Sequence, residues 1–136
     1  MNNIFKFRVY DKPLKKYMEF KEFKFMNVEF TFNPIKKEAE IEYDKERYIV
    51  EQCTGLKDKN GKLIYDGDLI KSPSNSHVLE VFRYIDGTYM TREYRKNGYN
   101  ELSVYQFIAG EYGIEVVGNI HQNKELLKEE EVEDGN

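Results

Sequence analysis

Two aspartates and a histidine have the side-chain types that could hold a divalent metal ion. Asp66 and Asp68 flank Gly67, and His121 follows much later in the chain. Two carboxylates and an imidazole are a common ligand set for such a cation, and a metal bound there could support hydrolysis. An Asp on either side of a Gly is also frequent in turns without metal, where the carboxylates accept backbone N–H bonds. A metal-dependent hydrolase therefore stays an alternative, and we expect no metal-binding and no catalytic residue.

A second stretch with possible binding chemistry covers residues 82–99, where aromatic and basic side chains are interleaved. It contains Phe82, Arg83, Tyr84, Tyr89, Arg92, Tyr94, Arg95, Lys96 and Tyr99. On one barrel face the rings could stack bases while the cations hold phosphates. An ordinary hairpin has the same composition, and in it Tyr84, Tyr89 and Tyr94 cannot share one face without a bulge. A single-stranded nucleic-acid-binding module is therefore an alternative function for this stretch.

The other reactive side chains lack the neighbours that catalysis needs. Cys53 is the one cysteine, so no intramolecular disulfide can form, and its place at the end of a strand-like run indicates packing. Ser72, Ser74 and Ser76 form no nucleophile elbow, and His77 beside them is expected to be solvated. The glycines follow neither of the common phosphate-binding spacings. We therefore expect a protein that is not an enzyme and has no cofactor.

The elements that position these side chains are expected to be β-strands. The chain has 11 Tyr and 9 Phe but no Trp, and flat rings pack well on a half-buried pleated surface. Tight-turn sequences recur between apolar runs, namely DKNG at 58–61, DGD at 66–68, DG at 86–87 and NG at 97–98. Such punctuation is typical of a mainly β protein.

Short alternating runs locate the strands along the chain. We expect strands at residues 4–10, 39–43, 47–52, 69–71, 78–84, 88–94 and 114–120, the first of which begins a hairpin that ends near residue 20. Between residues 23 and 32 the alternation changes parity. This change indicates a bulge near Met26 and Asn27, or two pairing segments, within a meander of short strands over residues 20–53. A helical segment near residues 20–27 stays open as a further alternative.

The strand pattern and the charges divide the chain into three parts. We expect a strand-rich N-terminal segment at residues 1–53, a small SH3-like β-barrel at 54–122 and an acidic C-terminal tail at 123–136. The formal net charge is −4, and because the tail carries the negative charge, the body is close to neutral. A neutral body supplies no obvious basic face for duplex DNA.

The sequence gives no indication of a membrane span or of an export signal. Its apolar runs fall short of the roughly 20 residues that a transmembrane helix needs. Charged residues interrupt the apolar ones in the N-terminal sequence MNNIFKFRVYD, which lacks the layout of a signal peptide. We therefore expect a cytoplasmic protein without a membrane partner.

Three sequence blocks carry a resemblance to a known family. They are KFRVYDKPLKKYM at 6–18, QCTGLKDKNGKLIYDGDLIK at 52–71 and EVVGNIHQNKELL at 115–127. In this order they resemble the YopX family of phage and prophage proteins. Tyr10 stands where the family often has Trp, and His121 stands where an aromatic residue is common. Both differences are expected to be packing substitutions. The resemblance implies no enzymatic activity, cofactor or catalytic residue, so none is carried over.

The resemblance and the residues together predict an accessory protein encoded by a phage or prophage. We expect it to act in the cytoplasm of the bacterial host by protein–protein interaction or self-assembly. Exposed strand edges favour pairing with another protein or with further copies of the chain, so a homo-oligomer is expected. Nucleic acid is the less favoured partner, and no small-molecule partner is expected.

Overall fold

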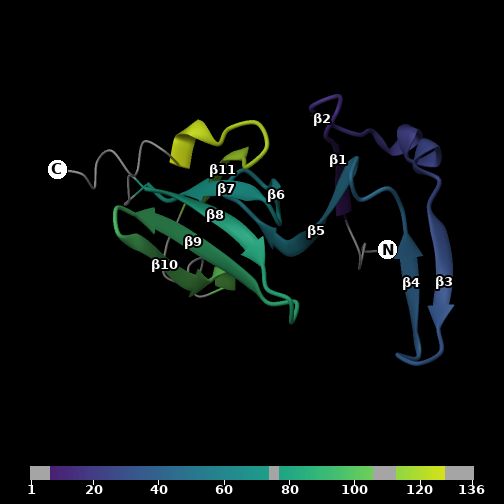
Figure 1. Cartoon of the computed structure of the whole chain (residues 1–136). Coiled ribbons are helices and arrows are strands. Elements are labelled where there is room, and N and C mark those ends of the chain that lie inside the picture. The colour runs from purple at the N-terminus through teal and green to yellow at the C-terminus, as the bar shows by residue number, and fades with distance from the viewer. Residues whose placement is uncertain (1–6, 74–76, 106–112, 128–136) are drawn as a thin grey trace. The chain divides into compact units, whose positions relative to one another are not determined.

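The computed structural model describes residues 7–73, 77–105 and 113–127 of the chain (Figure 1). In this part of the chain it contains eleven β-strands and little helix, so the expected mainly β class is confirmed. The chain divides into two compact units, Phe7–Glu51 and a second unit that begins at Gln52. Residues 4–6 of the first expected strand lie outside the described residues.

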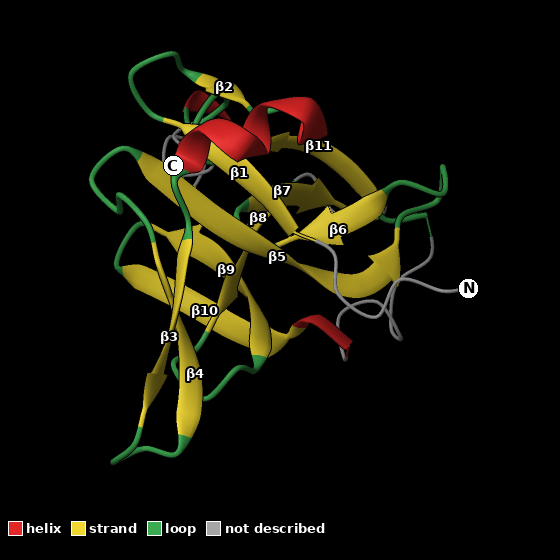
Figure 2. Ribbon diagram, turned by 90° about the vertical axis from the view of Figure 1, so that its right-hand side faces the viewer, coloured by secondary structure: helices red, strands yellow, loops and turns green. Residues whose placement is uncertain are grey.

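The first unit consists of two hairpins separated by a short helix. Its elements are β1 (Phe7–Asp11), β2 (Lys16–Tyr17), the 3₁₀-helix η1 (Phe20–Met26), β3 (Glu29–Asn33), β4 (Glu38–Glu42) and the beginning of β5 (Tyr48–Lys57). β1 pairs with β2 around the expected turn, with Tyr10 opposite Tyr17, and its other neighbour is β5. Figure 2 shows β3 and β4 as a two-stranded hairpin of their own.

The parity change near residues 23–32 is explained by a helix, so the helical alternative is confirmed and the bulge near Met26 is wrong. The backbone N–H of Glu19 donates to Glu22 Oε1 at 2.8 Å at the start of η1. Asn27 ends the helix with a φ of 52°, a left-handed conformation that Asn tolerates better than most residues. The η1 helix places Met26 in the core of this unit.

Two buried carboxylates connect the strands of the first unit. Glu51 accepts hydrogen bonds from Arg8 Nε at 2.8 Å and from the Tyr17 hydroxyl at 2.9 Å. Asp11 accepts one from Arg47 Nη2 at 3.0 Å. A buried carboxylate is strongly destabilising unless it is paired, so these contacts fix the pairing of β1 with its neighbours.

The second unit contains a five-stranded antiparallel sheet in the order β10-β9-β8-β7-β11. Its elements are the end of β5, then β6 (Leu63–Tyr65), β7 (Asp68–Lys71), β8 (Val78–Arg83), β9 (Tyr89–Arg95), β10 (Gly98–Ser103) and β11 (Glu115–Asn119). β6 pairs with the end of β5, with Tyr65 opposite Cys53. The core consists of Ile64, Ile70, Leu79, Val81 and Ile114.

The segment after β11 packs against this unit. Leu127 is buried with Leu69 and Val78, and the turn that contains it lies beside β7 and β11 (Figure 1). A Cβ added at Gly118 would lie 2.5 Å from Asn123 Oδ1, so the return of the chain requires glycine there. The expected acidic tail therefore begins with packed residues, and residues 128–136 lie outside the described part. Within the described residues, no helix is long and apolar enough to cross a lipid bilayer.

Candidate functional site

The candidate site is one face of strands β8, β9 and β10, which lie next to one another in Figure 2. Side chains alternate between the faces of a sheet, and the pairings place Glu80 opposite Arg92 and Arg92 opposite Glu101. The side chains on this face, which we call the aromatic face, are Glu80, Phe82, Tyr84, Met90, Arg92, Tyr94, Tyr99 and Glu101. The other face of β8 carries Leu79 and Val81 of the core.

Arg92 lies at the centre of the aromatic face, between two rings and a carboxylate. Its Cζ is 4.2 Å from the ring centroid of Phe82 and 4.4 Å from that of Tyr99. Its Nε and Nη2 donate to Glu101 Oε2 at 2.9 and 2.6 Å. Burial disfavours the charge, but hydrogen bonding with Tyr94 and Glu101 raises the pKa of Arg92 above its ordinary value. The guanidinium is thus paired with a carboxylate and lies against two aromatic rings.

Two tyrosine hydroxyls of the aromatic face are also paired with its carboxylates. The Tyr84 hydroxyl donates to Glu101 Oε1, and this bond, together with Arg92, holds the pKa of Glu101 below its usual value. The Tyr94 hydroxyl donates to Glu80 Oε1 at 2.7 Å; burial and this bond raise the pKa of Tyr94. Both shifts move the pKa further from neutral, so at neutral pH Glu101 is held ionised and Tyr94 protonated.

The aromatic face exposes two tyrosine rings, Tyr84 beside the β8–β9 turn and Tyr99 beside the β9–β10 turn. Tyr99 is 55% exposed and Tyr84 is 38% exposed. Each ring is held by its contacts with neighbouring side chains, the Tyr99 ring against Arg92 and Tyr94 and the Tyr84 ring against Phe82. Rigid, amphipathic rings of this kind are enriched among the residues that dominate protein–protein binding energy.

The structure separates the cations that the sequence grouped with these rings. Arg83 and Arg95 occupy positions of the opposite parity, and Arg95 Nη2 donates to Glu93 Oε1 at 2.7 Å. Tyr89 also lies on the opposite face, where its hydroxyl donates to Gln52 Oε1 at 3.3 Å. The prediction that the three tyrosines cannot share one face is therefore confirmed. One cation and two carboxylates remain on the aromatic face, which makes a poor cradle for phosphates.

The acidic turn and the segment before His121 do meet, but as scaffold. Asp68 is buried, and its Oδ2 accepts the backbone N–H of Tyr65 at 2.8 Å, as expected for a turn carboxylate. The Ile120 N–H donates to the Gly67 carbonyl oxygen at 2.9 Å. Across the described residues, no three His, Cys, Asp or Glu side chains gather in a metal-binding cluster.

Asp58 is a buried carboxylate whose role the sequence analysis did not identify. Its Oδ1 accepts the N–H groups of Asn60 at 2.8 Å and Lys62 at 2.9 Å, and its Oδ2 accepts that of Val116 at 3.0 Å. Burial alone would raise the pKa of Asp58, but the three donors lower it below its ordinary value. Asp58 therefore connects the DKNG turn to β11. Its place at the start of the turn sequence was the one feature from which its hydrogen bonding within the turn could have been predicted.

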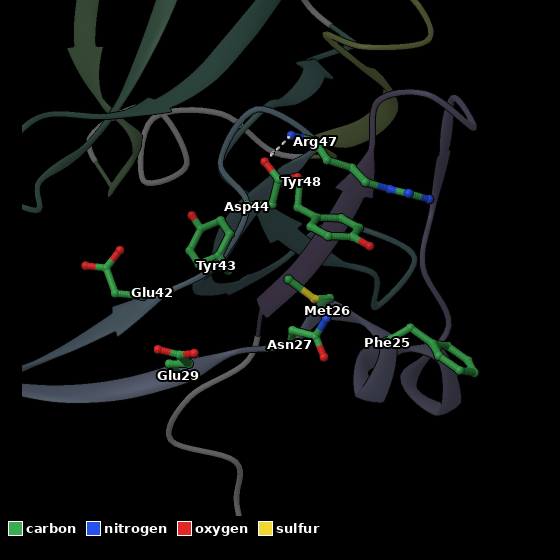
Figure 3. A pocket seen from close by; sticks show the side chains of 9 residues that line it. All are labelled: Phe25, Met26, Asn27, Glu29, Glu42, Tyr43, Asp44, Arg47 and Tyr48. Atoms are coloured by element: carbon green, nitrogen blue, oxygen red, sulfur yellow. Dashed lines mark hydrogen bonds between the residues drawn. The ribbon is translucent and has the colours of Figure 1, made fainter.

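The first unit contains a cavity of about 420 Å³ at the base of the β3–β4 hairpin (Figure 3). Its lining residues are Phe25, Met26, Asn27, Glu29, Glu42, Tyr43, Asp44, Arg47 and Tyr48. Glu29 and Glu42 lie on one side, and Tyr48 and Met26 lie between them and Phe25 (Figure 3). Hydrogen bonding with Asp11 raises the pKa of Arg47, whose guanidinium is engaged there. The sequence analysis did not predict this cavity.

Comparison with known proteins relates the chain to one family. A family model described as YopX protein matches residues 6–128. A search of the curated proteins found no match. Among solved structures, the crystal structure of protein EF1440 from Enterococcus faecalis is similar, with 25% identity over 93% of this chain and 99% of that chain and a TM-score of 0.48. Because the family model spans all three sequence blocks, the resemblance is confirmed and the chain belongs to the YopX family.

Proposed function

We propose that this chain is a phage- or prophage-encoded accessory protein that acts by binding another protein through the aromatic face. It works in the cytoplasm of the host cell, without a cofactor and without catalysing a reaction. The observation that supports this proposal most directly is the pair of exposed rings, Tyr84 and Tyr99, held in place around the Arg92–Glu101 ion pair. Self-assembly is a second part of the same proposal.

The organisation of the aromatic face favours protein binding over nucleic-acid binding. Ordered rings lose little conformational freedom when a partner covers them, so more of the contact energy appears as affinity. Tyr and Arg are also enriched in the centres of protein interfaces. A single-stranded nucleic acid would stack on Tyr99 but would find Arg92 already engaged by Glu101. Nucleic acid is therefore the second candidate.

We also infer that residues 54–122 form an SH3-like barrel. The short antiparallel strands β7 to β10, which follow one another along the chain, support this inference, together with the β5–β6 pairing and the return of β11 beside β7. A barrel of this kind does not itself define a ligand, since function lies in the site on the fold. The aromatic face is the part of the unit that would choose the partner.

A pull-down from cells in which the phage or prophage is active tests the proposal. Tagged wild type is compared with Tyr99→Ser and with Asn100→Ala, whose side chain lies at the next position of β10 and on its other face. We expect a stoichiometric protein that survives nuclease and is captured by wild type and Asn100→Ala. Tyr99→Ser should lose at least about tenfold in capture, the effect of removing an interface hot spot. Capture that disappears with nuclease would instead support the nucleic-acid alternative.

A further inference from the structure

The β3–β4 hairpin has complementary features at its two ends. At one end a turn over residues 34–37 joins the strands. At the other end the cavity described above is flanked by Glu29 and Glu42, the first residue of β3 and the last of β4. Both ends belong to the first unit. Residues 35–37 are exposed at the turn, and Glu29 and Glu42 are exposed at the other end.

The turn presents one aliphatic and two cationic side chains in a fixed conformation. Asn33 Oδ1 accepts the N–H groups of Ile35 at 3.0 Å and Lys36 at 3.1 Å, and Lys37 takes a left-handed φ of 57°. Ile35 is 91% exposed, and both lysines are exposed. A turn that is already ordered loses little entropy when it enters a binding site.

The cavity carries carboxylates, the opposite charge, at its edge, and its lining mixes polar groups with Met26 and the rings of Phe25, Tyr43 and Tyr48. Glu29 and Glu42 are directly opposite in the β3–β4 ladder, and Asp44 follows on the same rim. Like charges opposite each other are destabilising, and a cation placed against them removes that cost. Met26 and Tyr48 line the interior, and the volume of about 420 Å³ lies within the range of ligand-sized pockets. This chemistry fits an aliphatic side chain flanked by lysines.

A two-fold axis can bring the two ends together in a pair of chains. The axis lies beside the hairpin, level with its middle at the Thr31–Glu40 pair, and runs perpendicular to the strands. It exchanges the turn of one copy with the base of the other, because the two ends lie on opposite sides of it. Each strand has five residues, or about 17 Å, so two hairpins of equal length overlap along their whole extent.

We propose that the chain forms a two-fold dimer in which Ile35 of each copy enters the cavity of the other. Lys36 and Lys37 then lie against Glu29 and Glu42 of the second copy. The contact is self-complementary, as a closed two-fold interface requires. This inference deepens the self-assembly part of the proposed function and rests on it, but it is independent of the aromatic face.

Charge-reversal variants test the dimer by light scattering after size exclusion and by sedimentation. Lys36→Glu/Lys37→Glu gives two acidic ends, and Glu29→Lys/Glu42→Lys gives two basic ends. We expect each variant alone to dimerise at least about a hundredfold more weakly than wild type, since like charges then face each other at both contacts. An equimolar mixture should form the dimer again, because opposite charges then meet at both contacts.

Two further variants make the result specific. The quadruple variant, with both reversals in one chain, should dimerise with itself and fail to pair with wild type. Lys12→Glu/Lys21→Glu carries the same charge change at exposed positions outside the hairpin and should dimerise like wild type. Circular dichroism verifies that each variant is folded.

Three results would overturn the dimer. They are a monomeric wild type at every concentration, an assembly that neither charge reversal weakens, and a mixture that does not recover. A monomeric wild type that still captures a protein through Tyr99 would overturn the dimer and leave the protein-binding proposal standing. A dimer with the expected charge dependence but without Tyr99-dependent capture would support the dimer and overturn protein binding through the aromatic face.

Discussion

Asp58 shows how one side chain can define a turn and a strand pairing at once. Its carboxylate accepts three backbone N–H groups, from Asn60, Lys62 and Val116. Asp58→Ala leaves these donors without a partner, so we expect the free energy of unfolding to fall by about 3 kcal/mol. Urea unfolding followed by circular dichroism measures the change. Asn60→Ala, which keeps the backbone donor of the same turn, should stay within about 0.5 kcal/mol of wild type.

The protonation of Asp58 makes its contribution depend on pH. The pKa of Asp58 is lower in the folded chain than its ordinary value, so the folded state favours the carboxylate. Its stabilising effect is therefore full above about pH 4, the ordinary value, and is lost as the pH falls through the folded pKa. We expect the stability of wild type to fall more steeply than that of Asp58→Asn when the pH is lowered from 5 towards 2. Parallel pH profiles for the two proteins would contradict this role.

At the level of elements, the turn that contains Leu127 contributes more to the stability of the fold than a solvent-exposed acidic tail would. Leu127 is buried with Leu69 and Val78, although it lies in the segment that the sequence analysis assigned to the acidic C-terminal tail. We expect Leu127→Ala to lower the free energy of unfolding by about 2–3 kcal/mol, as for other buried leucines. Thermal unfolding measures this change, with Lys124→Ala at an exposed position of the same turn as the control. Equal melting temperatures for Leu127→Ala and wild type would show that the turn does not pack.

Most strands could be predicted because their signals are local. Alternation located β8, and the NG sequence at residues 97–98 marked the place of the β9–β10 turn. The loop residues are Lys96 and Asn97, and Gly98 lies opposite Arg95. Counting back from an Asn97–Gly98 loop would have placed Ser103 opposite Arg92, so the pairing of Glu101 with Arg92 could not be found from the turn signal alone. The contact of Arg92 with Phe82 is also local, because the DG turn at residues 86–87 joins their two strands. The pairing of β11 with β7 could not be predicted, because the order of strands in the sheet is not a local property. The η1 helix was ambiguous because 3₁₀ turns are short and leave a weak periodic pattern.

At the scale of the whole molecule, self-association should be visible in the stability of the protein. If copies associate only when folded, the melting temperature rises with concentration. We expect this rise for wild type and for Lys12→Glu/Lys21→Glu, and a much smaller one for Lys36→Glu/Lys37→Glu. Calorimetry at several concentrations gives the comparison. The rise should also diminish at about 1 M salt, where screening acts within about 3 Å.

The overall charge and the aromatic face together predict weak nucleic-acid binding. The net charge is −4, and the cation at the centre of the face is paired with Glu101. We expect fluorescence anisotropy to detect little binding of single-stranded or duplex oligonucleotides at physiological salt. Tight binding with a steep salt dependence would show that phosphates reach the cations after all.

Crosslinking from position 99 inside the cell tests the role of the aromatic face most directly. A photoreactive phenylalanine analogue replaces Tyr99 in one protein and Asn100 in another, in cells where the phage or prophage is active. Irradiation should yield a nuclease-resistant protein adduct from position 99 and little or none from position 100, because only the first side chain lies on the aromatic face. No adduct from position 99, or one that nuclease removes, would contradict protein binding by this face.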